Sequence, residues 1–115
     1  MSNKKPFNLT NIINAVGGDR ESLKEMIKIF LDTLPPLISE IKDALDKKDW
    51  QTVAKAAHSA KSNINMLEIK SSFAKMKEIE ALAKAKEKTE KIPLLLEDIK
   101  TEMEKVFEEL RKELE

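Results

Sequence analysis

The stretch WQTVAKAAHSAKSNINML, residues 50–67, carries the clearest structural signal in the chain, because its apolar side chains recur at alternating steps of three and four. That spacing is typical of one face of an α-helix, in which 3.6 residues complete a turn. The stretch is also rich in alanine, the residue with the highest helix propensity. The buried face that we expect comprises Trp50, Val53, Ala57, Ala60, Ile64 and Leu67.

Three other segments repeat this spacing, and no segment alternates apolar and polar residues with a period of two. Residues 23–44, 73–83 and 92–110 each carry one apolar stripe, which predicts four amphipathic helices and no strand. Such helices with short connections pack as an antiparallel bundle. The predicted fold class is therefore all-α: an antiparallel four-helix bundle with a short additional N-terminal helix, residues 9–16, packed across one end.

Glycine and aspartate mark the predicted helix ends. Gly17-Gly18 follows the short N-terminal segment, and glycine readily takes the left-handed conformation that ends a helix. Asp19 and Asp49 each precede a predicted helix and can cap it, because an aspartate side chain accepts hydrogen bonds from free backbone N–H groups. A charged turn at residues 86–91 precedes the last helix.

Proline occurs at two places with opposite expected effects. Pro35-Pro36 lies inside the stripe of residues 23–44, where proline removes a backbone donor and clashes with the preceding turn. We therefore expect a kink or break near Leu34. Pro93 lies near the front of the last helix and is tolerated there, because first-turn N–H groups have no helical partner.

Length, composition and charge limit the classes of protein to which the chain can belong. Its 115 residues suit one domain, residues 1–115, and 21 basic and 21 acidic residues leave no basic stripe for nucleic acid. The chain has no cysteine, no apolar run of a signal peptide and no stretch of about 18 apolar residues that could span a membrane. We expect a free-standing, monomeric, cytoplasmic protein that binds neither nucleic acid nor membrane.

The only histidine, His58, lies on the helix of residues 50–67 but outside its apolar stripe. At about 100° per residue, it projects roughly 130° from the centre of that stripe, so the imidazole should face solvent. Such a histidine usually has no function, but here small and polar neighbours leave the ring open to a protein partner. The neighbours along this face are Ala54, Lys55, Lys61, Ser62 and Asn65.

Other chemistry at this histidine is poorly supported. A di-iron bundle uses Glu-x-x-His pairs, and no glutamate stands three residues before His58. With one histidine and no cysteine, a zinc site would need carboxylates from several helices. No strand–turn–helix elbow indicates a serine hydrolase, and the two glycines form no phosphate-binding loop. We therefore expect no metal and no cofactor on this chain.

The sequence AHSAKS, residues 57–62, resembles the histidine-containing phosphotransfer (HPt) domains of bacterial phosphorelays when it is placed in a helix of a four-helix bundle. The family motif is roughly His-x-Leu-Lys-Gly/Ser, preceded by alanine and followed by small residues. The acidic turn and bulky residue at residues 46–50 and the Gly-Gly-Asp element at residues 17–19 also look like the family. The resemblance implies a phosphocarrier rather than a classical enzyme.

The chain departs from the family pattern around and after the histidine. Many members have asparagine eight residues after it and glycine ten residues after it, where this chain has Met66 and Glu68. The leucine before the motif lysine is Ala60. The family commonly has Glu or Gln on the next helix about 22 residues after the histidine, and that position is Glu80. These departures would affect the local packing and the choice of partner. They leave the group that would be phosphorylated, His58, unchanged.

Within this resemblance each candidate site residue has a role. His58 would attack a phosphoryl group through Nε2, because a free imidazole, with a pKa of about 6.5, is largely neutral at physiological pH. Glu80 would accept a hydrogen bond from Nδ1–H and fix the tautomer, and Lys61 would offset the charge of the phosphoryl oxygens. Lys55 would add to the positive field, and Ser62 would leave space because its side chain is small. Asn65 would contact the phosphate or the partner.

The implied partners are response-regulator receiver domains, a hybrid histidine kinase, or both, with Mg²⁺ held by the receiver. They would dock on the small and apolar residues around His58, on the helices of residues 50–67 and 73–83, with exposed Met66 or Leu67 adding apolar contact. A second hypothesis is a helical adaptor that binds a receiver or kinase but carries no phosphate. A third, a metal-binding bundle, predicts metal in the purified protein.

Overall fold

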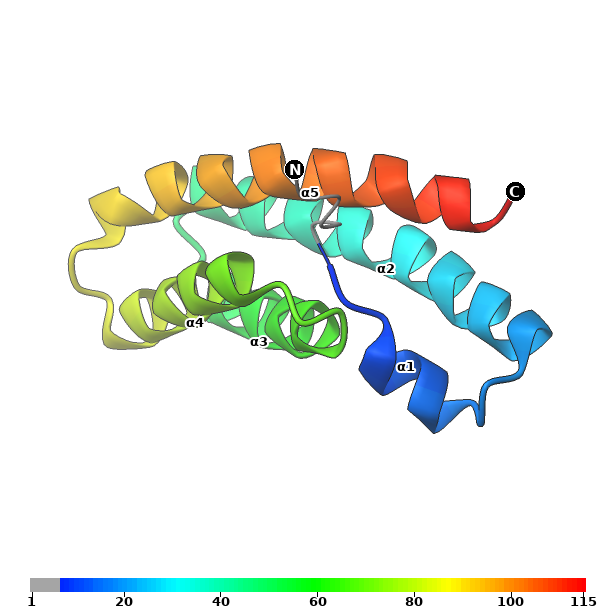
Figure 1. The fold of residues 1–115 in the computed structure, drawn as a ribbon. Helices are drawn as coiled ribbons and strands as arrows, with labels where there is room; N and C mark the ends of the chain where they lie inside the picture. Colours follow the sequence, from blue (N-terminus) through cyan, green and yellow to red (C-terminus); the bar gives the residue numbers. More distant parts are fainter. Residues whose placement is uncertain (1–6) are drawn as a thin grey trace, which may run out of the picture.

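The computed structural model describes residues 7–115, and these residues form five α-helices and one short 3-10 helix (Figure 1). The helices are α1 (Thr10–Ala15), α2 (Arg20–Asp46), α3 (Trp50–Met66), α4 (Lys70–Ala85), η1 (Thr89–Lys91) and α5 (Ile92–Glu113). No strand occurs within the described residues. The predicted all-α class and the four bundle helices are confirmed.

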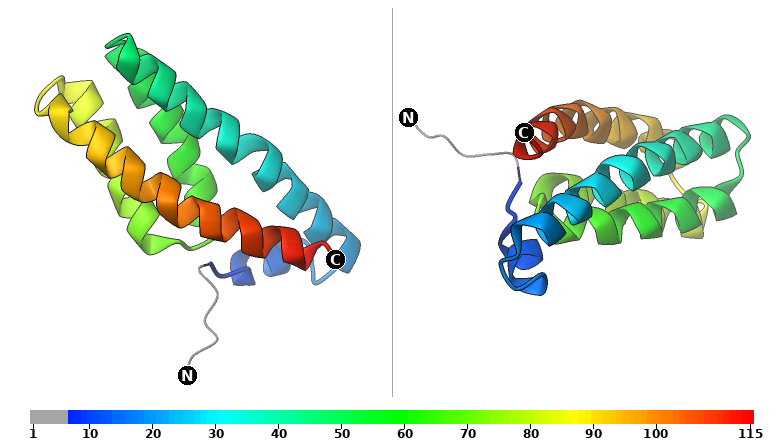
Figure 2. Two further views of the ribbon diagram at one scale, coloured as in Figure 1. Left: turned by 90° about the horizontal axis from the view of Figure 1, so that it is seen from above. Right: turned by 90° about the vertical axis from the view of Figure 1, so that its right-hand side faces the viewer.

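The four longer helices run antiparallel, and α3 and α4 are shorter than the other two (Figures 1 and 2). α3 and α4 have 17 and 16 residues, whereas α2 and α5 have 27 and 22. α1 lies beyond the ends of α3 and α4, against the N-terminal part of α2 (Figure 1). The fully buried Ile12 anchors it, and the backbone N–H of Asn8 donates to the carbonyl of Leu67 at 2.8 Å.

The core follows the predicted stripes with small shifts of register. Ile38 is buried, whereas Leu37, which we expected in the stripe, is half-buried. Two buried residues of the described part of the chain are polar, Ser72 and Glu80, and both lie on α4. A buried polar group is costly without a hydrogen-bond partner. The hydroxyl of Ser72 donates to the carboxylate of Glu102 on α5, and the partners of Glu80 form the candidate site.

We expected a kink or break near Leu34, next to Pro35-Pro36, and the break is wrong, because α2 runs without interruption from Arg20 to Asp46. The proline ring fixes φ near −65°, which is a helical value. The cost of proline inside a helix, about 3 kcal/mol, therefore comes from the lost backbone donor and from the clash with the preceding turn. Burying one large apolar side chain contributes about 1.5–3 kcal/mol, so packing on both sides of the prolines outweighs that cost. The buried residues are Ile27, Phe30, Leu34, Ile38, Ile41 and Ala44.

The predicted helix ends are confirmed. Asp19 accepts a hydrogen bond from the backbone N–H of Ser22 at 3.0 Å, and Asp49 accepts one from that of Thr52 at 3.3 Å. Hydrogen bonds from the Ser22 and Thr52 side chains and backbones lower the pKa of both aspartates. Gly17 and Gly18 have φ values of 65° and 79°, in the region that favours glycine. Pro93 lies in the first turn of α5.

Glu68 follows the end of α3 and has a φ of 54°. This is the position at which the HPt pattern has glycine, and the backbone has the left-handed conformation that glycine adopts without strain. A side chain with a Cβ costs about 1 kcal/mol in this region. Glu68 therefore has the backbone conformation that suits glycine at this position, and this conformation is strained for a residue with a Cβ.

We expect Glu68→Gly to raise the free energy of unfolding by roughly 0.5–1 kcal/mol, because it removes this strain at a small cost in unfolded-state entropy. Urea unfolding followed by circular dichroism measures the change. Glu68→Ala is the matched control: it removes the carboxylate but keeps Cβ, so no comparable gain is expected. A glycine variant that is no more stable than the alanine variant would contradict the assignment of strain.

Candidate functional site

His58 projects from the middle of α3 into solvent, and its side chain is 63% exposed. Its neighbour Ala57 is fully buried, as is Ala60. The apolar stripe of α3 therefore faces the core, and the imidazole lies on the opposite, solvent-facing side. The predicted orientation of the histidine is confirmed. The orientation follows from helical periodicity, because His58 falls on the polar side of an amphipathic helix.

Glu80 on α4 faces His58 across the seam between the two helices. Its Oε2 lies 2.9 Å from His58 Nδ1, which is the predicted contact between residues 22 positions apart. The Glu80 side chain is only 7% exposed, so the protein holds the carboxylate in place. An ionised carboxylate can only accept hydrogen bonds. Nδ1 must therefore be the donor, and in the neutral ring the lone pair lies on Nε2.

Two lysines complete the surroundings of Glu80. Lys61 Nζ lies 2.8 Å from Oε1, and Lys84 Nζ lies 3.0 Å from Oε2, the oxygen that also accepts from His58. Lys61, which we expected beside the phosphoryl oxygens, thus contacts the carboxylate in this structure. We did not predict Lys84. The spacing of Glu80 and Lys84, four residues apart on one helix, is the signal that could have found it.

The charge environment keeps Glu80 ionised. Burial raises the pKa of this carboxyl, but hydrogen bonds from Lys61, Lys84 and His58 lower it further than burial raises it. The result is a pKa of about 2, against an ordinary value of 4.5. Glu80 is therefore a permanent anion at physiological pH, paired with two ammonium groups and one imidazole N–H.

We expect the Glu80 cluster to stabilise the fold at neutral pH and to lose this effect in acid. Because the pKa is lowered from 4.5 to about 2 on folding, the contribution is complete above pH 4.5 and disappears as pH falls towards 2. A shift of this size corresponds to roughly 3 kcal/mol.

Urea unfolding of the wild type and Glu80→Gln at pH 7 and pH 2.5 measures this effect. The other carboxylates contribute equally to both proteins, so they cancel in the difference between the two free energies of unfolding. This difference should be smaller at pH 2.5 than at pH 7. An equal difference at both pH values would contradict the expectation.

The other predicted site residues lie at different distances from the ring. The hydroxyl of Ser62 donates to the backbone carbonyl of His58 at 3.3 Å and not to the imidazole. Lys55 is exposed and lines the same groove as His58. Asn65 is exposed about two helical turns beyond His58, roughly 10 Å along the axis. The structure thus joins His58, Lys61 and Glu80 in one cluster and leaves Asn65 outside it.

The predicted apolar contact at the end of α3 is wrong for Leu67. This side chain is fully buried, and its carbonyl accepts the hydrogen bond from Asn8. Met66 is half-buried rather than exposed. Leu67 belongs to the apolar stripe of residues 50–67, so its burial agrees with helical periodicity and contradicts only the expected exposure.

An open groove of about 770 Å³ lies beside His58. Its lining extends from His58 towards the N-terminal end of α3 and the C-terminal end of α4, and it includes Trp50, Ala54, Lys84 and Lys86. Within residues 7–115, no three His, Cys, Asp or Glu side chains are grouped so that they could hold a metal ion. No helix in this part of the chain is long and apolar enough to cross a membrane.

The family model of the Hpt domain matches residues 25–115. The matched region runs from the second turn of α2 to the last residue and includes His58, Lys61 and Glu80. No curated protein and no solved structure matches the chain.

Proposed function

The chain belongs to the Hpt domain family, whose members are phosphotransfer modules of two-component signalling, and from this premise we propose that it shuttles a phosphoryl group between aspartates of receiver domains through a phosphohistidine at His58. One observation carries the proposal. The only imidazole of the chain is exposed, and a buried, ionised carboxylate binds its Nδ1, which leaves Nε2 free towards solvent.

The transfer step needs no base on this chain. The Nε2 lone pair of His58 attacks the phosphorus of a receiver's phospho-aspartate, an N–P bond forms, and the acyl O–P bond breaks. The aspartate leaves as a carboxylate with the bonding electron pair. The ring, still protonated at Nδ1, becomes cationic, and Glu80 stabilises this charge across the 2.9 Å contact. The reverse step passes the group to the carboxylate of another receiver.

The cations around His58 support this step electrostatically. The phosphoryl group brings three anionic or partly anionic oxygens to a ring that adjoins Lys61 and Lys84 through their common partner Glu80. Ammonium groups next to such oxygens offset their charge during transfer. Lys84 is 65% exposed, so its ammonium group lies at the surface, where it pairs with Glu80 at 3.0 Å. Any Mg²⁺ belongs to the receiver, whose acidic pocket would hold it.

Phosphotransfer profiling tests the proposal. Each receiver of the source organism is phosphorylated with labelled phosphate and incubated with the protein. At least one should transfer label to this chain in an acid-labile, base-stable form, as expected for an N–P bond, and a second receiver should remove it. Phosphoramidate, a small phosphodonor that needs no docking, tests His58 by itself. Receivers that bind but leave the chain unlabelled, together with no labelling by phosphoramidate, would support an adaptor instead.

A further inference from the structure

We propose that the groove on one side of His58, here called the Trp50 groove, selects the receiver by accepting an apolar side chain that is flanked by carboxylates. The groove is lined by Trp50, Ala54, Lys55, Ala83, Lys84 and Lys86, next to His58 itself. This inference rests on the proposed function and adds the chemistry of the contact surface. It places the selective contact on the side of His58 that faces the α2–α3 and α4–α5 connections.

Two of the side chains that line the Trp50 groove are small and apolar. Ala54 on α3 and Ala83 on α4 are both buried, and neither extends beyond Cβ. Trp50 is half-buried and presents part of its indole to the groove. Aromatic side chains in such partly enclosed positions contribute strongly to protein–protein binding. The shape therefore suits one apolar side chain that packs against Trp50.

The groove does not continue on the other side of His58. There the hydroxyl of Ser62 is bound to the backbone, and Lys61 is only 21% exposed and contacts Glu80. Further along α3, Leu67 is fully buried. The groove therefore offers an apolar recess on the Trp50 side to a partner that approaches Nε2.

The rim of the Trp50 groove is positively charged. Lys55, Lys84 and Lys86 are exposed, and the carboxylate that lines the groove, Glu80, is buried and paired with both Lys61 and Lys84. Positive rims of this kind increase the association rate of acidic partners and exclude basic ones.

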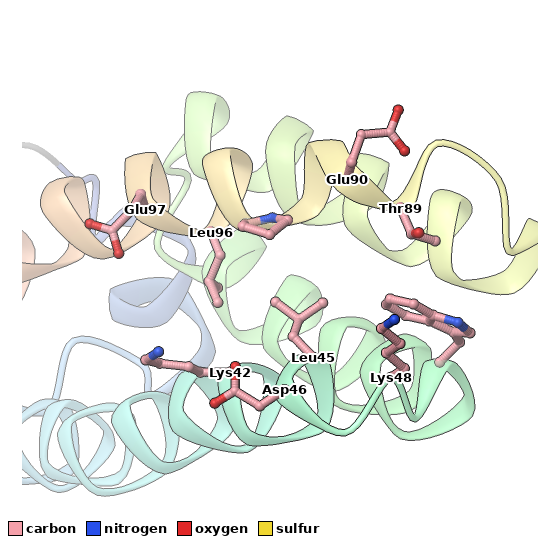
Figure 3. Close-up of a pocket in the computed structure, with 10 residues that line it drawn as sticks. Lys42, Leu45, Asp46, Lys48, Thr89, Glu90, Leu96 and Glu97 are labelled. Atoms are coloured by element: carbon pink, nitrogen blue, oxygen red, sulfur yellow. The ribbon is translucent and has the colours of Figure 1, made fainter.

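Two other grooves of the described residues lack this charge pattern. The groove in Figure 3, about 470 Å³, has α2 on one side and η1 and α5 on the other, and Trp50 lines it as well. Its lysines, Lys42 and Lys48, are outnumbered by carboxylates: Asp46, Glu90 and Glu97. A third groove, about 450 Å³, is lined by one lysine and three carboxylates: Lys47, Glu40, Asp43 and Asp49. Charge complementarity to an acidic partner therefore distinguishes the Trp50 groove, which is also the one that contains His58.

Steady-state transfer from the fastest phosphorylated receiver to a second receiver, which removes the phosphoryl group so that this chain turns over, tests the inference. Lys86→Glu reverses a rim charge on an exposed residue at the end of α4 and should raise the KM for the receiver about tenfold or more, with kcat within about threefold. Lys105→Glu, on the exposed face of α5, makes the same charge change away from the groove and should leave KM unchanged. A lower kcat with an unchanged KM, or no difference between the two variants, would overturn the inference.

Trp50 provides an independent measurement, because it is the only tryptophan of the chain. Titration with a receiver whose tryptophans have been replaced by phenylalanine should shift Trp50 emission and protect it from acrylamide. Receiver binding that leaves Trp50 emission and quenching unchanged would overturn the inference. This titration does not depend on phosphotransfer, so a failure of the proposed function, seen as no label from any receiver or from phosphoramidate, is distinguishable from a failure of the groove.

Discussion

His58→Gln should abolish acceptance of the phosphoryl group, lowering label incorporation from receivers and from phosphoramidate by about a thousandfold or more. The reason is chemical: a glutamine amide has no nucleophilic nitrogen lone pair, and the chain has no second histidine. Acid-labile label, measured after gel separation, gives the rate for each protein. This is the largest effect that the structure predicts.

The fold should survive this substitution. The His58 side chain is 63% exposed, and a glutamine amide N–H can take the place of Nδ1–H as a donor to Glu80. The free energy of unfolding should therefore change by less than about 0.5 kcal/mol. The Trp50 titration with a receiver serves as the control for intact binding. Label that persists on His58→Gln would show that the acceptor is another residue and would end the proposal.

Glu80→Ala should give the second-largest effect, a fall of roughly 10- to 100-fold in the rate of phosphorylation of His58. This range is taken from metal-binding histidines, where removing the group that orients the ring through its second nitrogen has an effect of this size. Without Glu80, nothing fixes Nδ1–H as the proton-bearing nitrogen, and the cationic phosphohistidine loses its nearest anion. Lys61 and Lys84 also lose their common partner and repel each other. Phosphoramidate labelling measures the rate without any contribution from docking.

Glu80→Gln separates orientation from charge. The amide oxygen can still accept from Nδ1–H, so this variant should retain more of the rate than Glu80→Ala, while the negative charge is lost. Both variants should lose about 1–3 kcal/mol of stability at pH 7, because a buried, hydrogen-bonded charge is removed. If both variants lose stability but keep the full phosphorylation rate, Glu80 has only a structural role.

The sequence was sufficient for the features that depend on one helix at a time. Steps of three and four place apolar side chains on one face, so the four bundle helices and the outward direction of His58 follow from the spacing of residues. The capping roles of Asp19 and Asp49 depend on backbone groups within three residues of each aspartate, and they too were correct. The pairing of His58 with Glu80 was expected from the resemblance to HPt domains.

Only the tertiary structure decided the features that depend on how helices meet. α2 continues through Pro35-Pro36, because the burial of apolar side chains on both sides of the prolines outweighs the free-energy cost of proline inside a helix. The tertiary structure also brought Lys84 to the carboxylate that His58 already contacts, and it opened the Trp50 groove on one side of the imidazole. The physical reason is that helical periodicity sets the direction of a side chain about its own axis, whereas its neighbours depend on the register and distance of a second helix, which the packing of the whole core determines.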